Sequence, residues 1–178
     1  ESDISLLTVF DQAQGVDNRI NGFLGNLLQG ILLVGIVIFL ALGFRSSLMV
    51  IIAIPLSIIM GLFFVDLFGY GLEQISIAGL VVALGLLVDN SIVMVENINR
   101  YRDQGFSPRE AAIKGAAEIG WPIASATATT VLAFVPIIMM PDASGEFIKT
   151  LPLTIIATLV VSLFVALTLT PLIASKTY

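Results

Sequence analysis

Five long apolar runs constrain this 178-residue chain more than any other feature. A helix needs about 20 mostly apolar residues to cross the hydrocarbon core of a bilayer. Runs of this kind lie at residues 27–44, 48–68, 75–95, 121–140 and 151–173. Only 12% of the residues are charged, whereas ordinary soluble domains carry about 25%. We therefore predict an all-α membrane protein, in which about five transmembrane helices over residues 27–175 form a bundle in contact with the lipid bilayer.

Local signals mark several ends of these helices. A short polar break separates the first two runs at residues 45–47. Thr150, followed by Pro152, is typical of a helix start, and Pro171 is placed to end the last helix. Trp121 begins the fourth run with an aromatic residue that suits the membrane interface.

A short surface helix is predicted within the loop 96–120. Ser107 and Glu110 have the Ser-x-x-Glu spacing of a capping box, and Pro108 occupies the first helical position. This pattern predicts a separate helix from Pro108 to about Ile119 on the membrane surface.

The first 26 residues are polar and acidic, and they lack the basic start of a signal peptide. Ile4–Phe10 has the composition of a strand. Ile20, Phe23 and Leu27 recur at helical spacing, so we expect a helix that leads into the first span. Because the chain does not begin with Met, we expect residues 1–26 to be the end of a larger extracytoplasmic region.

Lysine and arginine residues predict the orientation of the bundle, because they accumulate in cytoplasmic loops. With five spans, one side of the membrane carries Arg45, Arg100, Arg102, Arg109, Lys114 and Lys176. The other side carries Arg19 and Lys149. We therefore predict a multi-pass protein with an extracytoplasmic N-terminus and a cytoplasmic C-terminus.

Composition excludes several classes of function. The chain has no Cys and no His, which rules out thiol chemistry, imidazole catalysis and the usual zinc sites within it. Its net charge is −5 with 8 Lys and Arg residues, so nucleic acid is not an expected partner. The sequence shows no nucleophile–base pair, so we expect neither an enzyme nor a bound cofactor.

Asp89 is the ionisable residue with the most unusual position. It lies about 14 residues into the third run, roughly 21 Å along a helix. About a dozen Leu, Ile and Val residues around it, at roughly −0.3 to −0.6 kcal/mol each, offset the insertion cost of one Asp, about +2.5 to +3.5 kcal/mol. An acid inside a membrane helix is by default functional, and burial favours its neutral form. Asp89 is thus predicted to bind and release protons, although a structural hydrogen-bond network or a position at the interface is the alternative.

Glu96 follows Asp89 by seven residues and falls near the same helical face. It is a candidate to extend a proton path towards the cytoplasm. The simpler interpretation, which we slightly prefer, is an ion pair at the interface with Arg100, four residues further on.

Neutral polar residues surround these acids. Asn90 and Ser91 add donors and acceptors beside Asp89, but they do not carry protons at accessible pH. The fourth run contains Ser125, Thr127, Thr129 and Thr130. Hydroxyl groups in membrane helices commonly stabilise helix packing. If their face meets Asp89, Thr127 and Thr130 become candidates for a hydrated proton path.

Several segments resemble the resistance–nodulation–division (RND) family of efflux transporters. The sequence GLLVDNSIVMVEN at residues 85–97 and GFSPREAA at 105–112 resemble the fourth membrane helix of that family and the loop after it. Further similarities are Val9–Gln12, Phe44–Ser47, Ile54–Leu56, Thr127–Thr130 and Phe134–Pro136. The resemblance covers nearly the whole chain and implies helices two to six of the N-terminal half of a transporter.

The resemblance implies proton-driven export from the bacterial inner membrane, with protons as the coupling ion and Asp89 as their carrier. Many drug pumps of the family have a second Asp beside it, where this chain has Asn90. The partner Lys of the family lies in a C-terminal half that these residues do not include, in agreement with the absence of a mid-membrane cation here. The family also implies a homotrimer, with a periplasmic adaptor and an outer-membrane channel as further partners. Two alternatives remain open, namely a related protein-export or lipid-handling module and a scaffold that does not transport.

Overall fold

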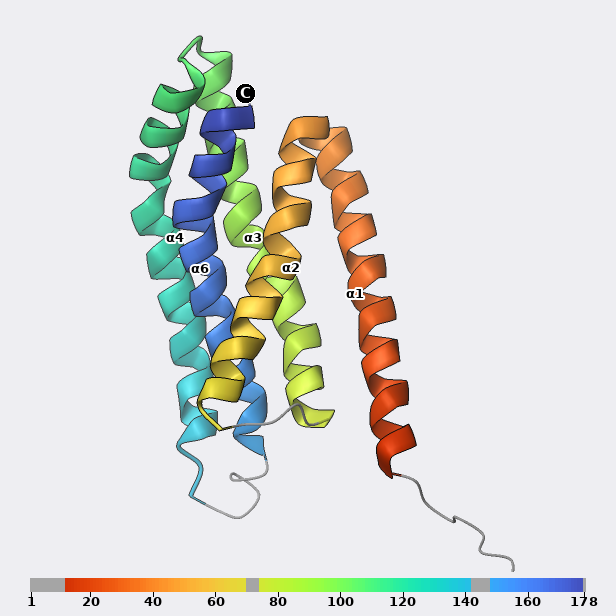
Figure 1. Ribbon diagram of the computed structural model, residues 1–178. Coiled ribbons are helices and arrows are strands. Elements are labelled where there is room, and N and C mark those ends of the chain that lie inside the picture. The colour runs from red at the N-terminus through yellow and green to blue at the C-terminus, as the bar shows by residue number, and fades with distance from the viewer. Residues whose placement is uncertain (1–11, 70–73, 142–147, 178) are drawn as a thin grey trace, which may run out of the picture.

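The computed structural model describes residues 12–69, 74–141 and 148–177. These ranges contain five long helices, which are α1 (Gln12–Leu42), α2 (Phe44–Leu67), α3 (Gln74–Asp103), α4 (Pro108–Ile138) and α6 (Thr150–Thr177) (Figure 1). All five are long and apolar enough to cross a membrane. The predicted all-α membrane bundle is therefore confirmed, while the strand predicted for Ile4–Phe10 lies outside the described residues.

Helix α6 is the centre of the bundle and packs against α2, α3 and α4. Helix α1 stands at the edge, where it contacts α2 and α3 (Figure 1). Close packing around α6 depends on glycine. A Cβ on Gly61 of α2 would lie 2.7 Å from Thr158 Oγ1, and a Cβ on Gly79 of α3 would lie 2.9 Å from the carbonyl oxygen of Leu151. Small residues at these positions allow the backbones to approach.

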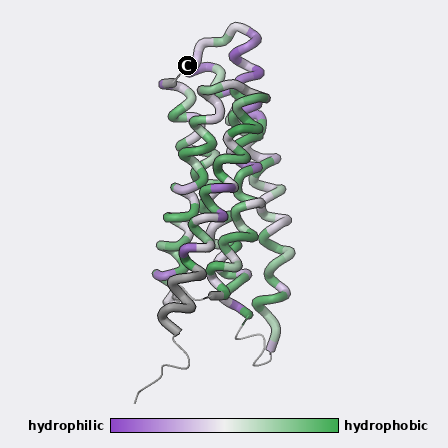
Figure 2. Tube along the Cα trace, turned by 90° about the vertical axis from the view of Figure 1, so that its right-hand side faces the viewer, coloured by the Kyte–Doolittle hydropathy of each residue, from purple (hydrophilic) through white to green (hydrophobic). Residues whose placement is uncertain are grey.

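Hydrophobic residues dominate the length of the bundle, with a few hydrophilic positions midway (Figure 2). The α1–α2 connection, the α3–α4 connection and the C-terminus of α6 lie together at one end (Figure 1). We call this the basic end, because it brings together six of the eight Lys and Arg positions, namely 45, 100, 102, 109, 114 and 176.

The connection between α1 and α2 corrects the predicted break at residues 45–47. A single residue, Gly43, separates the two helices, and residues 45–47 belong to the first turns of α2. Gly43 has φ = 83°, in the left-handed region that favours glycine. The chain therefore reverses at the glycine, and the buried Ser47 hydroxyl donates a hydrogen bond to the carbonyl oxygen of Gly35 across the turn.

Helix α4 shows that the predicted short surface helix is wrong in its extent. The capping box is present, since Glu110 N donates to Ser107 Oγ and Ser107 N donates to Glu110 Oε2. The helix then continues through Trp121 and Pro122 to Ile138 as one element. A proline inside a helix removes one backbone donor, and here that loss does not end the helix.

The other helices also extend beyond their predicted limits. Helix α1 begins by Gln12, which confirms the expected helix that leads into the first span, and α3 continues past residue 95 to Asp103. Helix α6 begins at Thr150, as predicted, but passes through Pro171 and ends at Thr177. The prediction that Pro171 ends this helix is therefore wrong, for the same reason as at Pro122.

Candidate functional site

The candidate site begins with Asp89, which lies at the middle of α3, 15 residues after its first residue. Asp89 is exposed, and it lines a groove of about 190 Å³ between α1, α2 and α3. Apolar residues form most of the lining, which comprises Gly30, Ile31, Val34, Ile54, Leu84, Gly85, Val88 and Ile92. Among the described residues no cation forms an ion pair with Asp89. The carboxylate thus occupies an apolar groove without a charged partner from the described part of the chain.

Asn90 faces the fourth helix rather than this groove. Its Oδ1 accepts a hydrogen bond of 3.3 Å from Thr127 Oγ1 of α4, and Thr127 is buried. The Asn90 Nδ2 atom is also buried and has no hydrogen-bond partner in the part of the chain that the structure describes. The structure therefore connects the residue next to Asp89 to α4 and leaves the two N–H donors of Asn90 Nδ2 without a partner among the described residues.

The other hydroxyl groups of α4 bond to their own helix. Thr130 Oγ1 donates to the Ala126 carbonyl at 3.1 Å, and Thr129 Oγ1 donates to the Ser125 carbonyl at 2.9 Å. Such bonds satisfy the hydroxyl within the helix. The structure brings Thr127 to α3 through Asn90, whereas it does not place the Thr130 hydroxyl against Asp89 or Asn90.

Glu96 does not pair with Arg100, so that interpretation of the sequence is wrong. Arg100 instead binds Glu118 of α4, with 2.5 Å between Arg100 Nη2 and Glu118 Oε2. Glu118 is eighteen residues further along the chain, so helical spacing within α3 gave no sign of this pair. Glu96 is exposed and lines a shallow groove at the basic end with Val93, Asn97, Arg100, Asp103 and Ile119.

Asp89 and Glu96 belong to one exposed side of α3. Its members recur at intervals of three or four residues, the spacing of one helical face, and they are Gly85, Asp89, Val93, Glu96, Arg100 and Asp103. A Cβ on Gly85 would meet no atom within 4 Å. This side, which we call the open face of α3, carries both membrane acids in a single line towards the basic end.

The polar residues that hold α6 in place were not predicted from the sequence. Thr154, Thr158 and Ser162 are completely buried, and the Ser162 hydroxyl donates to the carbonyl oxygen of Leu87 on α3 at 2.8 Å. Their spacing of four residues in an otherwise apolar run was the available signal. Asn97 was also missed, although it ends the motif at 85–97, and its side chain donates to the Gly115 carbonyl at 2.9 Å.

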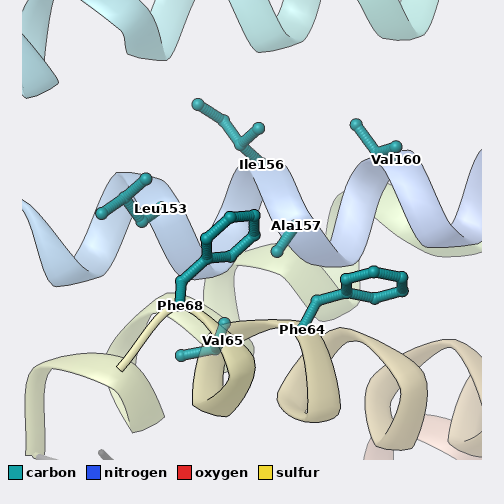
Figure 3. Close-up of a pocket in the computed structure, with 7 residues that line it drawn as sticks. All are labelled: Phe64, Val65, Phe68, Leu153, Ile156, Ala157 and Val160. Carbon is teal, nitrogen blue, oxygen red and sulfur yellow. The ribbon is translucent and has the colours of Figure 1, made fainter. Parts of the chain in front are cut away.

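Another groove, which is entirely apolar, lies between α2 and α6 (Figure 3). It lies where α2 ends and α6 begins, at the end of the bundle opposite to the basic end. Phe64, Val65 and Phe68 extend from α2, and α6 contributes Leu153, Ile156, Ala157 and Val160 (Figure 3). Among the described residues, no charged side chain lines it. The described residues also contain no group of three or more acidic side chains that could hold a metal ion.

Comparison with known proteins finds clear relatives. A profile of the AcrB/AcrD/AcrF family matches residues 1–177. The multidrug resistance protein MdtC of Proteus mirabilis is 36% identical over 131 residues, which cover 74% of this chain and 13% of that protein. An uncharacterized transporter of Haemophilus influenzae is 34% identical over 99% of this chain and 17% of its own length. MdtC of Photorhabdus laumondii is 34% identical over 82% of this chain and 14% of its own. The chain thus spans less than a fifth of the length of these relatives.

Proposed function

Because the chain belongs to the AcrB/AcrD/AcrF family of RND transporters, we propose that it carries protons during drug export, with Asp89 as the proton-binding residue. In this proposal it is the membrane segment of a proton–substrate antiporter in the bacterial inner membrane. Two of its relatives bear the name multidrug resistance protein, which favours drugs over proteins or lipids as the exported class.

The position of Asp89 is the observation that carries this proposal. A carboxylate at the middle of a membrane helix, in an apolar groove, costs free energy when it is charged. Proton binding removes the charge, so the occupied and empty states of Asp89 prefer different surroundings. A switch between the two states can therefore change how α3 packs against its neighbours.

Asn90 provides a route from that switch to α4. Its Oδ1 accepts a hydrogen bond from the Thr127 hydroxyl, so movement of α3 at Asp89 acts on a partly buried contact with α4. Asn90 does not itself exchange protons, which leaves Asp89 as the single ionisable side chain at this depth of α3. Glu96, on the open face of α3, is proposed to receive protons on their way to the cytoplasm.

The complete transporter supplies the remaining parts of this proposal. A lysine from a second membrane half faces Asp89 and neutralises it when the proton leaves. The basic end of the bundle faces the cytoplasm, as the distribution of Lys and Arg predicts. Three copies form a trimer, with an adaptor and an outer-membrane channel as partners on the periplasmic side.

An export measurement with Asp89→Asn in the full-length protein tests the proposal. Cells without other efflux pumps are loaded with a fluorescent cationic dye, and its loss is followed over time. We expect Asp89→Asn to export at the background rate at normal expression, because an amide of the same shape binds no proton. Purified Asp89→Asn protein is also studied in liposomes that contain a pH-sensitive dye. There it is expected to lose the proton movement that accompanies transport of the cationic dye.

Asp66→Asn is the matched control, because Asp66 is an exposed carboxylate near the C-terminal end of α2, away from the groove around Asp89. This variant is expected to export at close to the wild-type rate. If Asp89→Asn retains more than half of the wild-type export, Asp89 is not the proton carrier.

A further inference from the structure

A fourth groove lies at the basic end, between α4 and α6, and has a volume of about 430 Å³. Helix α4 contributes Arg109, Ala112, Ile113 and Ala116, and α6 contributes Thr168, Pro171, Leu172 and Ser175. Each set follows the spacing i, i+3, i+4 and i+7, so each is one face of its helix. These two faces therefore form one continuous groove between antiparallel helices.

Polarity changes along this groove. Arg109 lies at the start of α4, and Ser175 and Lys176 lie near the end of α6, so the polar residues gather at the basic end. Ala116 is seven residues further into α4, about 10 Å deeper. The apolar walls between these levels are well exposed, with 60% for Ile113 and 54% for Leu172.

The hydroxyl groups of the groove are already occupied. Thr168 Oγ1 donates to the Phe164 carbonyl at 2.6 Å, and Ser175 Oγ donates to the Leu172 carbonyl at 2.8 Å. Their donors are thus unavailable to a ligand, and the wall below Arg109 is effectively apolar. The guanidinium group of Arg109, at the mouth of the groove, is therefore the donor that can bind an anion.

Arg109 has no ionic partner among the described residues. The acid next to it, Glu110, is engaged in the capping box with Ser107. Lys176 adds a second exposed cation near the same end of α6. The groove therefore has a positive mouth and an apolar floor.

We propose that this groove binds an anionic phospholipid of the cytoplasmic leaflet, with the phosphate at Arg109 and an acyl chain along Ile113, Ala116 and Leu172. Guanidinium groups bind phosphate through paired charge-assisted hydrogen bonds, and basic pockets between membrane helices on the cytoplasmic side recognise anionic headgroups. The proposal uses the membrane orientation of the proposed function but not its proton chemistry. By contrast, the described residues that line the groove of Figure 3 include no charged side chain that could select a headgroup.

Native mass spectrometry of the full-length protein in mild detergent provides the test, with phosphatidylglycerol and phosphatidylcholine added in turn. We expect tighter binding of phosphatidylglycerol, and about fivefold weaker binding of it by Arg109→Gln. Ala116→Phe, which fills the floor and keeps the cation, is expected to lower binding too.

Lys114→Gln is the matched control, since it removes the same charge from α4 at a residue that lies over the Phe106 ring instead of in the groove. It is expected to bind phosphatidylglycerol like the wild type. The proposal is wrong if Arg109→Gln binds like the wild type, if both charge variants lose binding equally, or if the two lipids bind alike. Asp89→Asn is expected to bind lipid normally, so failure of proton transport and failure of this groove are distinguishable.

Discussion

Asn97 joins two helices through one amide group. Its Nδ2 donates to the Gly115 carbonyl at 2.9 Å and to Glu118 Oε2 at 3.2 Å, and the residue is 8% exposed. Gly115 makes this contact possible, because a Cβ there would lie 3.0 Å from Ile98 Cγ1. Asn97 therefore holds α3 and α4 together at the basic end and positions the acid that binds Arg100.

Replacement of Asn97 by alanine is expected to destabilise the protein by about 1–2 kcal/mol, because two partly buried hydrogen bonds are lost. The free energy of unfolding is measured by thermal unfolding of the full-length protein in detergent. Gln104→Ala, in the exposed α3–α4 turn, is the control and is expected to leave the midpoint unchanged. Equal midpoints for Asn97→Ala and the wild type would contradict the role of Asn97.

Individual candidate residues were predictable where the sequence alone sets their depth in the membrane. The place of Asp89 at the middle of a membrane helix follows from counting residues, and its proton chemistry stays a prediction. The partner of Arg100 was not predictable, because Glu118 meets it only when two separate helices pack. The same holds for Asn90 and Thr127, which are 37 positions apart.

At the scale of elements, α6 depends on close approach to two glycines. Its completely buried Thr154 and Thr158 donate hydrogen bonds to their own helix, so their hydroxyl groups need no acceptor on α2 or α3. Gly61 and Gly79 receive these threonines at short range. The fit of α6 thus depends on the absence of side-chain atoms at these two positions.

Gly61→Ala is expected to cost about 1–3 kcal/mol of folding free energy, because the added methyl group meets the Thr158 backbone at 3.0 Å. The measurement is again thermal unfolding in detergent. Gly25→Ala serves as the control, since a Cβ there meets nothing within 4 Å and alanine favours a helix. A midpoint for Gly61→Ala as high as that of the control would show that the α2–α6 contact is loose.

The number and type of helices were predictable from apolar length, whereas their ends were not. Pro122 and Pro171 suggested boundaries, because proline removes a backbone donor and starts helices well. In the fold α4 and α6 continue through them, since one missing hydrogen bond is small beside the packing of the turns on either side. The turn between α1 and α2 lies at Gly43, which has a left-handed φ. The polar composition of residues 45–47 had placed this turn too late in the sequence.

In the whole molecule, the Lys and Arg residues gather at one end of the bundle, although they are spread along the sequence. Helix ends that are distant in the chain meet at the basic end (Figure 1), and the residues of these helix ends include most of the cations of the chain. Because loops rich in Lys and Arg stay in the cytoplasm, the sequence predicts which end faces inwards. The topology remains a prediction that labelling can test.

Cysteine labelling tests the orientation directly, because the chain contains no native Cys. In a full-length protein without other cysteines, Asp66→Cys is expected to react with a membrane-impermeant maleimide in intact spheroplasts. Gln104→Cys, at the basic end, is expected to react only after lysis. The reverse pattern would invert the topology and place the Arg109 groove in the outer leaflet.

Because α4 is uninterrupted, it connects residues at two depths of the membrane. Thr127 and Arg109 are eighteen residues apart, five full turns or about 27 Å, so they project from the same side of one rod. If a change at Asn90 rotates α4, the guanidinium group of Arg109 moves as well. A single continuous helix thus connects the groove proposed for lipid with the Thr127–Asn90 contact at the centre of the bundle.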